Sequence, residues 1–336
     1  WLLFSQHKKP SGVWIMAYTD LDKPSLYFNA KAYTGDGTTS NTITGIGFQS
    51  DMVWFKSRST TDSHFLTDSV RGITKYIRPQ GTNAEETETT AITSLTSDGY
   101  VLSTAGNVND NNVTYASWNW KKVAGVFDIQ TYTGNGSNRT ISHNLGTVPK
   151  MMIIKKRNTT APWSVGHASL GANQVLELDA TDAVATDNSY WNNTRPTSSV
   201  FSLGTDGNQN TNGHTYVIYL FGNKQGMSKM GSYKGNGNAD GTFIYTGFKP
   251  SFILGKRTDS GGGWWILDSK RPGFNLTDEY LLANDVQAEA DDGSFASDFL
   301  SNGWKARATN GNFNASGGSY IYMAFAENPF TTSTGV

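Results

Sequence analysis

Three segments of the chain, about one hundred residues apart, carry an apolar side chain at every second position. A two-residue period is typical of a β-strand, in which successive side chains point to opposite faces of the sheet. The apolar positions on one face are Ala116, Trp118 and Trp120 in the first segment, Val217, Tyr219 and Phe221 in the second, and Ile321, Met323 and Phe325 in the third. The pattern predicts three strands, each with one face over the core of a β-sandwich.

The opposite face of these segments differs between the copies. It carries polar Ser117 and Asn119 in the first segment, but Ile218 and Leu220 in the second. Two interpretations are open for the middle segment. A neighbouring part of the assembly, either another repeat or another subunit, covers this face, or the face belongs to an ordinary second layer of the same sandwich.

Further landmarks recur in the same order with the same spacing. Tyr-x-Gly-x-Gly motifs begin at Tyr33, Tyr132 and Tyr233, which are 99 and 101 residues apart. The other landmarks are Arg58, Arg157 and Arg257; Ser69, Ser169 and Ser269; Asn109, Asn210 and Asn314; and Tyr115, Tyr216 and Tyr320. A period near one hundred residues exceeds that of a solenoid repeat and equals the size of a small domain.

We therefore predict an all-β fold of three tandem β-sandwich-like repeats. The predicted boundaries are 32–130, 131–231 and 232–336, with residues 1–31 as an N-terminal leader or attachment segment. The helix signal is thin and is confined to short stretches at residues 85–91 and 281–290. Because the chain opens on Trp1, without a methionine and a basic segment, we expect it to be part of a longer protein.

Composition agrees with this picture and excludes several kinds of function. The 336 residues include 36 glycines and 12% aromatic residues, which suits short strands joined by tight turns. The 27 Lys and Arg residues balance 28 Asp and Glu residues, so neither a nucleic-acid partner nor a polybasic membrane anchor is expected. The absence of cysteine excludes disulfides, thiolate nucleophiles and cysteine zinc sites. No apolar run approaches the length of a membrane span, so membrane insertion is not expected.

No catalytic, metal-binding or cofactor-binding residues are predicted. The Gly-x-Gly motifs lack the third glycine and the following helix of a dinucleotide site, and they are interpreted as turns. The five histidines are dispersed, without the spacing of metal ligands. Adjacent carboxylates do not recur at the repeat period and are interpreted as solvated loop charges; they are Glu85, Glu86 and Glu88, Asp278 with Glu279, and Asp291 with Asp292. Asp68 with Arg71, and Asp268 with Arg271, are interpreted as pairs that brace a turn.

Aromatic side chains are the only candidates for a binding surface. Trp163 and Trp264 follow variable loops at equivalent positions, and Tyr190 with Trp191 lies in a polar stretch. Aromatic rings at loop tips can stack on sugar rings, so these four residues are weak candidates for receptor binding. The alternative interpretation is that they belong to the core, where large aromatic residues are more often found.

Several sequence stretches resemble a repeat that is widespread in virion proteins of marine tailed phages. They are FDIQTYTGNGSNRTISHNLGTVPK at 127–150, YWNNT at 190–194, GFKPSF at 247–252 and AFAENPF at 324–330. The resemblance covers roughly residues 27–330, and such repeats belong to an uncharacterised domain family. It defines no active site, so it identifies no functional residues. It implies a structural protein on the exterior of a phage particle.

These observations lead to three functional hypotheses. The first is a non-enzymatic tail fibre or host-recognition adhesin, whose partners are other virion proteins and a host surface glycan or protein. The second is a capsid decoration or head-fibre protein, attached through residues 1–31. The third is a polysaccharide depolymerase that uses a pair of carboxylates. A homo-oligomer such as a trimer fits the first hypothesis, although no heptad pattern supports it, and three repeats can also surround a threefold axis within one chain.

Overall fold

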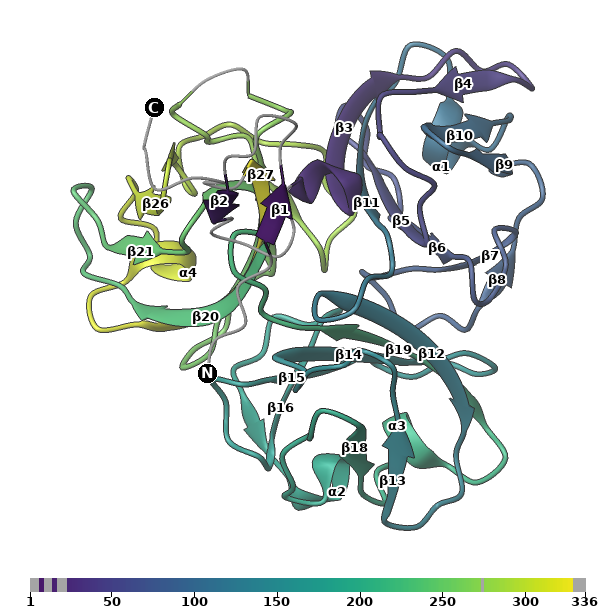
Figure 1. Cartoon of the computed structure of the whole chain (residues 1–336), viewed down its shortest axis with the longest axis vertical. Helices are drawn as coiled ribbons and strands as arrows, with labels where there is room; N and C mark the ends of the chain where they lie inside the picture. Colours follow the sequence, from purple (N-terminus) through teal and green to yellow (C-terminus); the bar gives the residue numbers. More distant parts are fainter. Residues whose placement is uncertain (1–5, 9–13, 17–22, 273–274, 329–336) are drawn as a thin grey trace.

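The prediction of an all-β fold is confirmed by the computed structural model, which describes residues 6–8, 14–16, 23–272 and 275–328 (Figure 1). The described helices are single turns, and all of the strand pairs are antiparallel. Three large sheets dominate the architecture, each packed against a smaller sheet. We call each large sheet with its small sheet a unit: the first spans residues 28–120, the second 127–221 and the third 228–328.

The first unit has a six-stranded sheet in the order β3-β11-β5-β6-β7-β8. Its strands are β3 (Phe28–Thr34), β11 (Thr114–Trp120), β5 (Met52–Ser57), β6 (Phe65–Asp68), β7 (Lys75–Ile77) and β8 (Glu86–Thr87). The small sheet contains β4 (Asn41–Ile43), β10 (Gly99–Leu102) and β9 (Ile92–Thr96), and is followed by the single turn α1 (Gly106–Asn109).

The second unit repeats this order as β12-β19-β14-β15-β16-β17. Its strands are β12 (Phe127–Thr133), β19 (Thr215–Phe221), β14 (Met151–Lys156), β15 (Ser164–His167), β16 (Gln174–Glu177) and β17 (Ala185–Thr186). Its small sheet has only two strands, β13 (Arg139–Ser142) and β18 (Val200–Leu203), and its helical turns are α2 (Asn188–Trp191) and α3 (Gly207–Asn210).

The third unit has a five-stranded sheet in the order β20-β27-β22-β23-β24. Its strands are β20 (Ser228–Lys234), β27 (Ser319–Asn328), β22 (Lys249–Arg257), β23 (Trp265–Asp268) and β24 (Leu281–Leu282). The small sheet contains β21 (Phe243–Tyr245), β26 (Gly303–Ala306) and β25 (Ser297–Leu300), and α4 is Gly311–Asn314. Outside the units lie the hairpin β1 (Gln6–Lys8) and β2 (Trp14–Met16), and the 3-10 turn η1 (Pro24–Leu26).

The strands correct two details of the sequence analysis. Each boundary drawn at 31/32, 130/131 and 231/232 falls inside the first strand of a unit, because the tyrosine motif used as a landmark ends that strand. The two stretches with a weak helix signal instead contain the short edge strands β8 and β24. The pairing of these segments with β7 and β23 overrides their local preference.

Each large sheet is buried on both faces, and alternate residues of its strands face different neighbours. One face packs against the small sheet of its own unit. The other face packs against the other two units in a single cluster, which contains the nine apolar residues from Ala116 to Phe325 that share one face of β11, β19 and β27. Ile218 and Leu220 lie in the separate core of the second unit. The interpretation of that face as a second layer of the same sandwich is therefore correct, and it is the opposite face that neighbouring units cover.

Aromatic rings from all three units meet in the shared cluster, in tilted and edge-to-face arrangements around Trp120. The ring of Trp120 lies 5.0 Å from Phe28, 6.4 Å from both Phe127 and Phe221, 5.5 Å from Phe252 and 5.8 Å from Phe325, measured between ring centroids. Figure 1 shows the three units grouped around this centre. Because the units share their largest apolar contact, we expect them to unfold together.

Polar contacts between the units run in one direction around the molecule. The indole Nε1 of Trp163 donates to the carbonyl oxygen of Arg78, so the second unit is bonded to the first, at 3.0 Å. Trp264 donates in the same way from the third unit to the carbonyl of Glu177 in the second, at 2.7 Å. At the equivalent position, Nε2 of His64 lies 3.0 Å from the carbonyl oxygens of Leu282 and Asp285 in the third unit. This contact completes the cycle of three interfaces.

Two contacts of a second set follow the same direction. The hydroxyl of Tyr219 donates to Asp68 at 2.8 Å, and the indole of Trp118 donates to Asp268 at 2.9 Å. The corresponding residue of the second unit is His167, whose Nε2 donates in the opposite direction, to the carbonyl of Tyr322 in the third unit, at 3.3 Å. Three equivalent interfaces thus join the units into one closed body.

The landmarks of the sequence hold the same corner of each unit together. A Cβ atom added at Gly35, Gly134 or Gly235 would lie 2.3 Å from a backbone oxygen, so only glycine fits there. The tyrosine before this glycine stacks on the tyrosine of the last strand, as Tyr132 does on Tyr216 at 5.0 Å. The buried asparagine landmark (Asn109, Asn210 or Asn314) accepts a hydrogen bond from the backbone nitrogen of the residue after this glycine. Sequence recurrence at these positions therefore reflects one local structure built three times.

Replacement of one such asparagine should destabilise the protein substantially. Asn210 accepts a hydrogen bond from the backbone nitrogen of Asn135 at 3.0 Å, and it donates to the carbonyls of Ser137 and Gly204 at 2.7 Å. Asn210→Ala leaves these buried groups without partners, and we expect a loss of about 3 kcal/mol in the free energy of unfolding. Chemical denaturation measures it. The exposed neighbour Asn212 is the matched control, since Asn212→Ala should change stability by less than about 0.5 kcal/mol; equal effects would contradict the prediction.

The His64 interface should make stability depend on pH. Nδ1 of His64 accepts from the indole of Trp54 at 2.8 Å, so Nε2 carries the proton that is donated to the third unit. Burial, reinforced by the charge of Lys56, lowers the pKa of His64 from 6.5 to about 3. Between pH 6.5 and pH 3, His64 is protonated in the unfolded chain but stays neutral in the folded chain. Its contribution to the free energy of unfolding is therefore fully present above pH 6.5 and is lost as the pH falls towards 3.

At pH 5, His64 alone should lower the free energy of unfolding by about 2 kcal/mol relative to pH 7.5. The measurement is chemical denaturation of the wild type and of His64→Gln at both pH values. The glutamine variant keeps an acceptor and donors but does not titrate, so its loss on acidification should be smaller by that amount. An identical pH dependence in the two proteins would contradict the expected role of His64.

Candidate functional site

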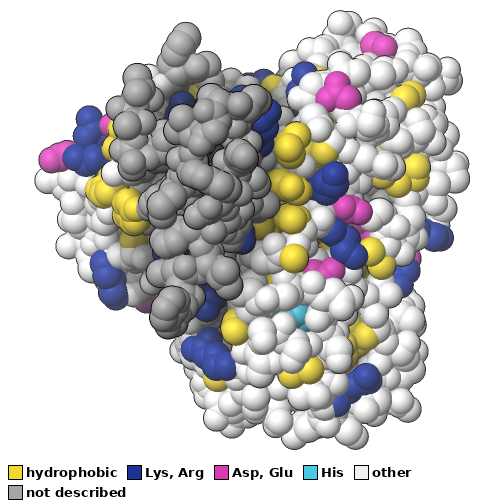
Figure 2. All heavy atoms as spheres, in the orientation of Figure 1, with side chains coloured by type: hydrophobic (Ala, Val, Ile, Leu, Met, Phe, Trp, Pro, Cys, Tyr) yellow, Lys and Arg dark blue, Asp and Glu magenta, His cyan; other side chains and the backbone are white. Residues whose placement is uncertain are grey.

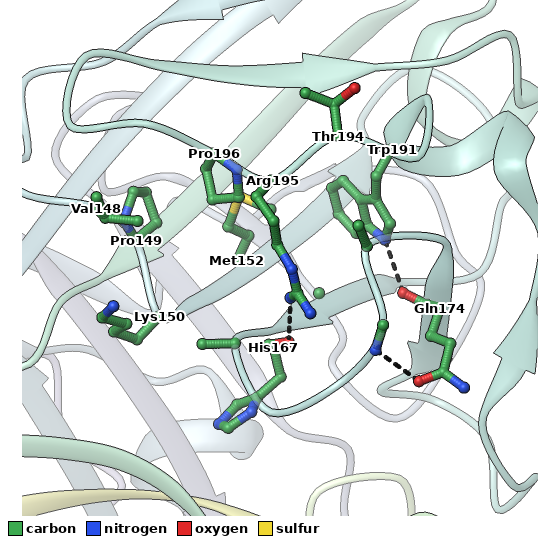
Figure 3. A pocket seen from close by; sticks show the side chains of 14 residues that line it. Val148, Pro149, Lys150, Met152, His167, Gln174, Trp191, Thr194, Arg195 and Pro196 are labelled. Atoms are coloured by element: carbon green, nitrogen blue, oxygen red, sulfur yellow. Dashed lines mark hydrogen bonds between the residues drawn. The ribbon is translucent and has the colours of Figure 1, made fainter.

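A half-open pocket of about 250 Å³ lies in the second unit, beside the end of β15 (Figure 3). Its walls come from the segment before β14, from the turn between β15 and β16, and from the loop after α2. Figure 3 shows Arg195 reaching towards the carbonyl of His167, with Trp191 on one side and Val148, Pro149 and Lys150 on the other. The pocket is thus framed by loops beside a sheet whose other face packs in the shared core.

The pocket exists because the second unit departs from the other two. In the first and third units a third strand, β9 or β25, completes the small sheet, whereas α2 and the loop after it occupy this part of the second unit. Asp187 caps α2 by accepting from the backbone nitrogen of Ser189 at 2.8 Å, and Asn192 ends it with a left-handed φ of 52°. The loop that follows carries Arg195 and Pro196 into the pocket wall.

A glycine makes room for the tryptophan of α2. Gly166 on β15 would place a Cβ atom 2.9 Å from Cζ2 of Trp191, so a larger residue would displace the indole. The residues paired at this position of the other sheets are larger, with Thr67 in β6 and Leu267 in β23. Trp191 donates from Nε1 to the carbonyl of Gln174 at 3.0 Å, which fixes the indole as one wall of the pocket.

The electrostatics of the pocket favour an anion. Lys150 and Arg195 line it, and none of its lining residues is acidic. Arg195 donates to the carbonyls of His167, at 3.4 Å, and Leu170. Neither cation pairs with a carboxylate of the described residues. His167 is unsuited to act as a base, because burial lowers its pKa to about 4 and its Nδ1 already accepts from the backbone nitrogen of Ser169.

The four aromatic candidates do not lie at exposed loop tips. Trp163 and Trp264 are 0% and 1% exposed, and their indoles join neighbouring units. Tyr190 and Trp191 are 8% and 3% exposed in the core of the second unit. The interpretation of these residues as core is correct, and Trp191 alone among them lines the pocket. Lys150 and Arg195 were missed because their signal, two cations 45 residues apart, has no recognisable spacing.

Glu85 and Glu86 differ from their interpretation as solvated charges, whereas Asp291 and Asp292 are exposed, in agreement with it. Glu85 accepts from Nε and Nη2 of Arg157 at 2.8 and 2.9 Å across the interface of the first two units, and Arg71 lies 3.1 Å away. Burial acts to raise the pKa of Glu85, but the bond from Arg157 and the charge of Arg71 outweigh it, so the pKa is lowered. Glu86 pairs with Arg78 at 2.9 Å. These groups are structural.

The paired residues expected to brace turns do so. Arg71 donates from Nε to Asp68, and Arg271 donates in the same way to Asp268 at 2.8 Å. Each arginine also reaches a glutamate at an interface between units, Glu85 or Glu289. Within residues 23–272 and 275–326, no group of three or more His, Asp or Glu side chains is arranged to hold a metal ion.

Charge is also dispersed on the visible, described part of the surface in Figure 2. On the face shown in Figure 2, cationic and anionic side chains are interspersed among uncharged ones. No helix of the described chain has the length and apolar content that crossing a membrane requires.

Comparison with known families matches residues 23–329 to a family model described as a domain of unknown function, DUF7483. The chain belongs to this family. The match begins at η1 and extends over all three units, so the DUF7483 region corresponds to the whole closed body. No curated protein matches the chain.

Proposed function

We propose that this chain is a non-enzymatic structural protein on the exterior of a phage particle, and that it serves as a tail fibre or host-recognition adhesin. The resemblance of four sequence stretches to virion repeats supports this assignment. The observation that carries it furthest is the shared aromatic core, which joins three loop-bearing units into one stiff body. A stiff scaffold that presents loops is suited to recognising a surface, because little conformational freedom is lost when it binds.

The use of the ionisable residues supports a binding role. The buried ion pairs that join or brace units involve Arg71, Arg271, Glu85 and Glu289, and His64 and His167 bond across interfaces. In contrast, the cations of the pocket have no carboxylate partner among the described residues and remain available to a ligand. Several copies on one particle would strengthen weak individual contacts through a high effective concentration.

The test is to locate the chain on the intact particle and to measure its effect on adsorption. We expect an image reconstruction to place it on the tail in a few copies. We also expect purified protein, added to host cells beforehand, to reduce adsorption of the phage. Density spread over the capsid lattice would replace the proposal with a decoration protein, and absence from the particle would refute both. Release of oligosaccharides from host surface polysaccharide would instead identify a depolymerase.

A further inference from the structure

We propose that the pocket of the second unit binds a carboxylate carried on a single ring, namely an acidic sugar residue such as a uronic acid. This inference rests on the proposed function for the source of the ligand, a host surface glycan. The binding chemistry itself is argued from the pocket.

The size of the pocket selects a small ligand. Its volume of about 250 Å³ lies below the roughly 300–1,000 Å³ of sites that enclose drug-sized molecules. One six-membered ring with its substituents suits this space, and the open side allows the ring to continue into a longer chain. A terminal or branching sugar of a polysaccharide has this shape.

The charges select an anion. A guanidinium has five N–H donors, and Arg195 directs donors to only two carbonyls, those of His167 and Leu170. These bonds hold the side chain in place across the pocket, while further N–H groups remain for a ligand. The Lys150 ammonium forms no hydrogen bond or ion pair with the part of the chain that the structure describes. Charge-assisted hydrogen bonds from two such cations would favour a carboxylate over a neutral hydroxyl.

The remaining walls select a ring over a bare inorganic ion. Val148, Pro149, Met152, Trp191 and Pro196 present apolar surface around the two cations. The C–H faces of a sugar ring can pack on the exposed part of this surface, to which the indole of Trp191, 3% exposed and held by its bond to Gln174, contributes only a small area. Phosphate or sulfate would leave these walls without contact. A carboxylate on a ring uses both the cations and the apolar walls.

The experiment is isothermal titration calorimetry of the purified full chain. D-Glucuronate, D-glucose, benzoate and inorganic phosphate are each titrated separately. D-Glucuronate should bind saturably, and D-glucose at least tenfold more weakly, because the two differ in the carboxylate. Benzoate tests whether the pocket accepts a carboxylate on a ring that is not a sugar. Binding of benzoate without glucuronate, equal affinity for glucose, or equal affinity for phosphate would each overturn the proposal.

Variants assign the binding to the pocket. Arg195→Gln and Lys150→Gln should each weaken glucuronate binding at least fivefold. Lys150→Gln removes no side-chain hydrogen bond or ion pair of the described residues, so it remains informative if Arg195→Gln disturbs its loop. Arg139→Gln is the matched control, because Arg139 is in the same unit and also donates to a backbone carbonyl, that of Thr133 at 2.9 Å, but lies outside the pocket. Undiminished binding by both pocket variants would refute the assignment.

The outcomes also separate this inference from the proposed function. A chain found on the phage tail that binds no carboxylate would refute the inference alone. Saturable binding of glucuronate by a chain that is absent from the particle would refute the proposed function and leave the pocket assignment standing.

Discussion

Replacement of Trp120 by alanine should lower the free energy of unfolding by about 3–5 kcal/mol, which is a large share of the total stability of a typical folded protein. The indole is completely buried and contacts five phenylalanine rings contributed by all three units. Its removal opens a cavity at the point where the units meet. Because the cavity belongs to no single unit, we expect the whole molecule to unfold at a lower denaturant concentration in a single transition.

Trp120→Phe provides the control for this experiment. The indole Nε1 of Trp120 has no hydrogen-bond partner, so replacement by phenylalanine removes volume without orphaning a polar group. Its cost should be clearly smaller than that of alanine. Near-ultraviolet circular dichroism reports the aromatic core, and far-ultraviolet circular dichroism reports the sheets. If the two signals separate in Trp120→Ala, the units unfold independently and the expectation of a shared transition is wrong.

Replacement of Asp68 by alanine should have a comparable effect, about 3–5 kcal/mol. The Asp68 carboxylate is fully buried and accepts from Nε of Arg71, from the backbone nitrogens of Val70 and Arg71, and from the hydroxyl of Tyr219 in the second unit. Without it, the buried guanidinium of Arg71 keeps only Glu85 as a charged partner. The substitution therefore removes both the brace of a turn and a bond between units.

Two further variants separate these contributions. Tyr219→Phe removes only the bond between units and should cost about 1 kcal/mol. Asp68→Asn keeps an acceptor of similar shape but removes the charge, so it should fall between the other two. Chemical denaturation of all three variants and of the Asp68→Ala/Tyr219→Phe double variant measures the coupling. A loss for Asp68→Ala no greater than that for Tyr219→Phe would show that the ion pair with Arg71 has no stabilising role.

The alternating segments show how far a sequence pattern reaches. The period of two identified β11, β19 and β27 as strands with one uniformly apolar face, because alternation follows directly from backbone geometry. It did not reveal what covers each face of these strands. A neighbouring unit and a second layer of the same sheet sandwich require the same apolar side chains, so the assignment of Ile218 to its own unit needed the three-dimensional structure.

The pocket was beyond sequence reasoning for a similar reason. Lys150 and Arg195 lie on separate segments, and only the replacement of a third strand by α2 and its loop brings them to one cavity. The sequence pointed to Trp191 through its polar surroundings, but the side chain lines the pocket from within the core and not from a loop tip. Local polarity describes the neighbours along the chain, whereas burial depends on neighbours in space.

By itself, then, the sequence determined the all-β class, the strands with two-residue periodicity and the glycine, tyrosine and asparagine landmarks, because each of these depends on contacts within a turn or along a strand. Only the tertiary structure decided which face each large sheet turns to its neighbours, how the units close on one another, and that the two cations of the second unit line one pocket. These features depend on side chains far apart in the chain, such as Trp120 and Phe252, whose contact arises only when the units pack together.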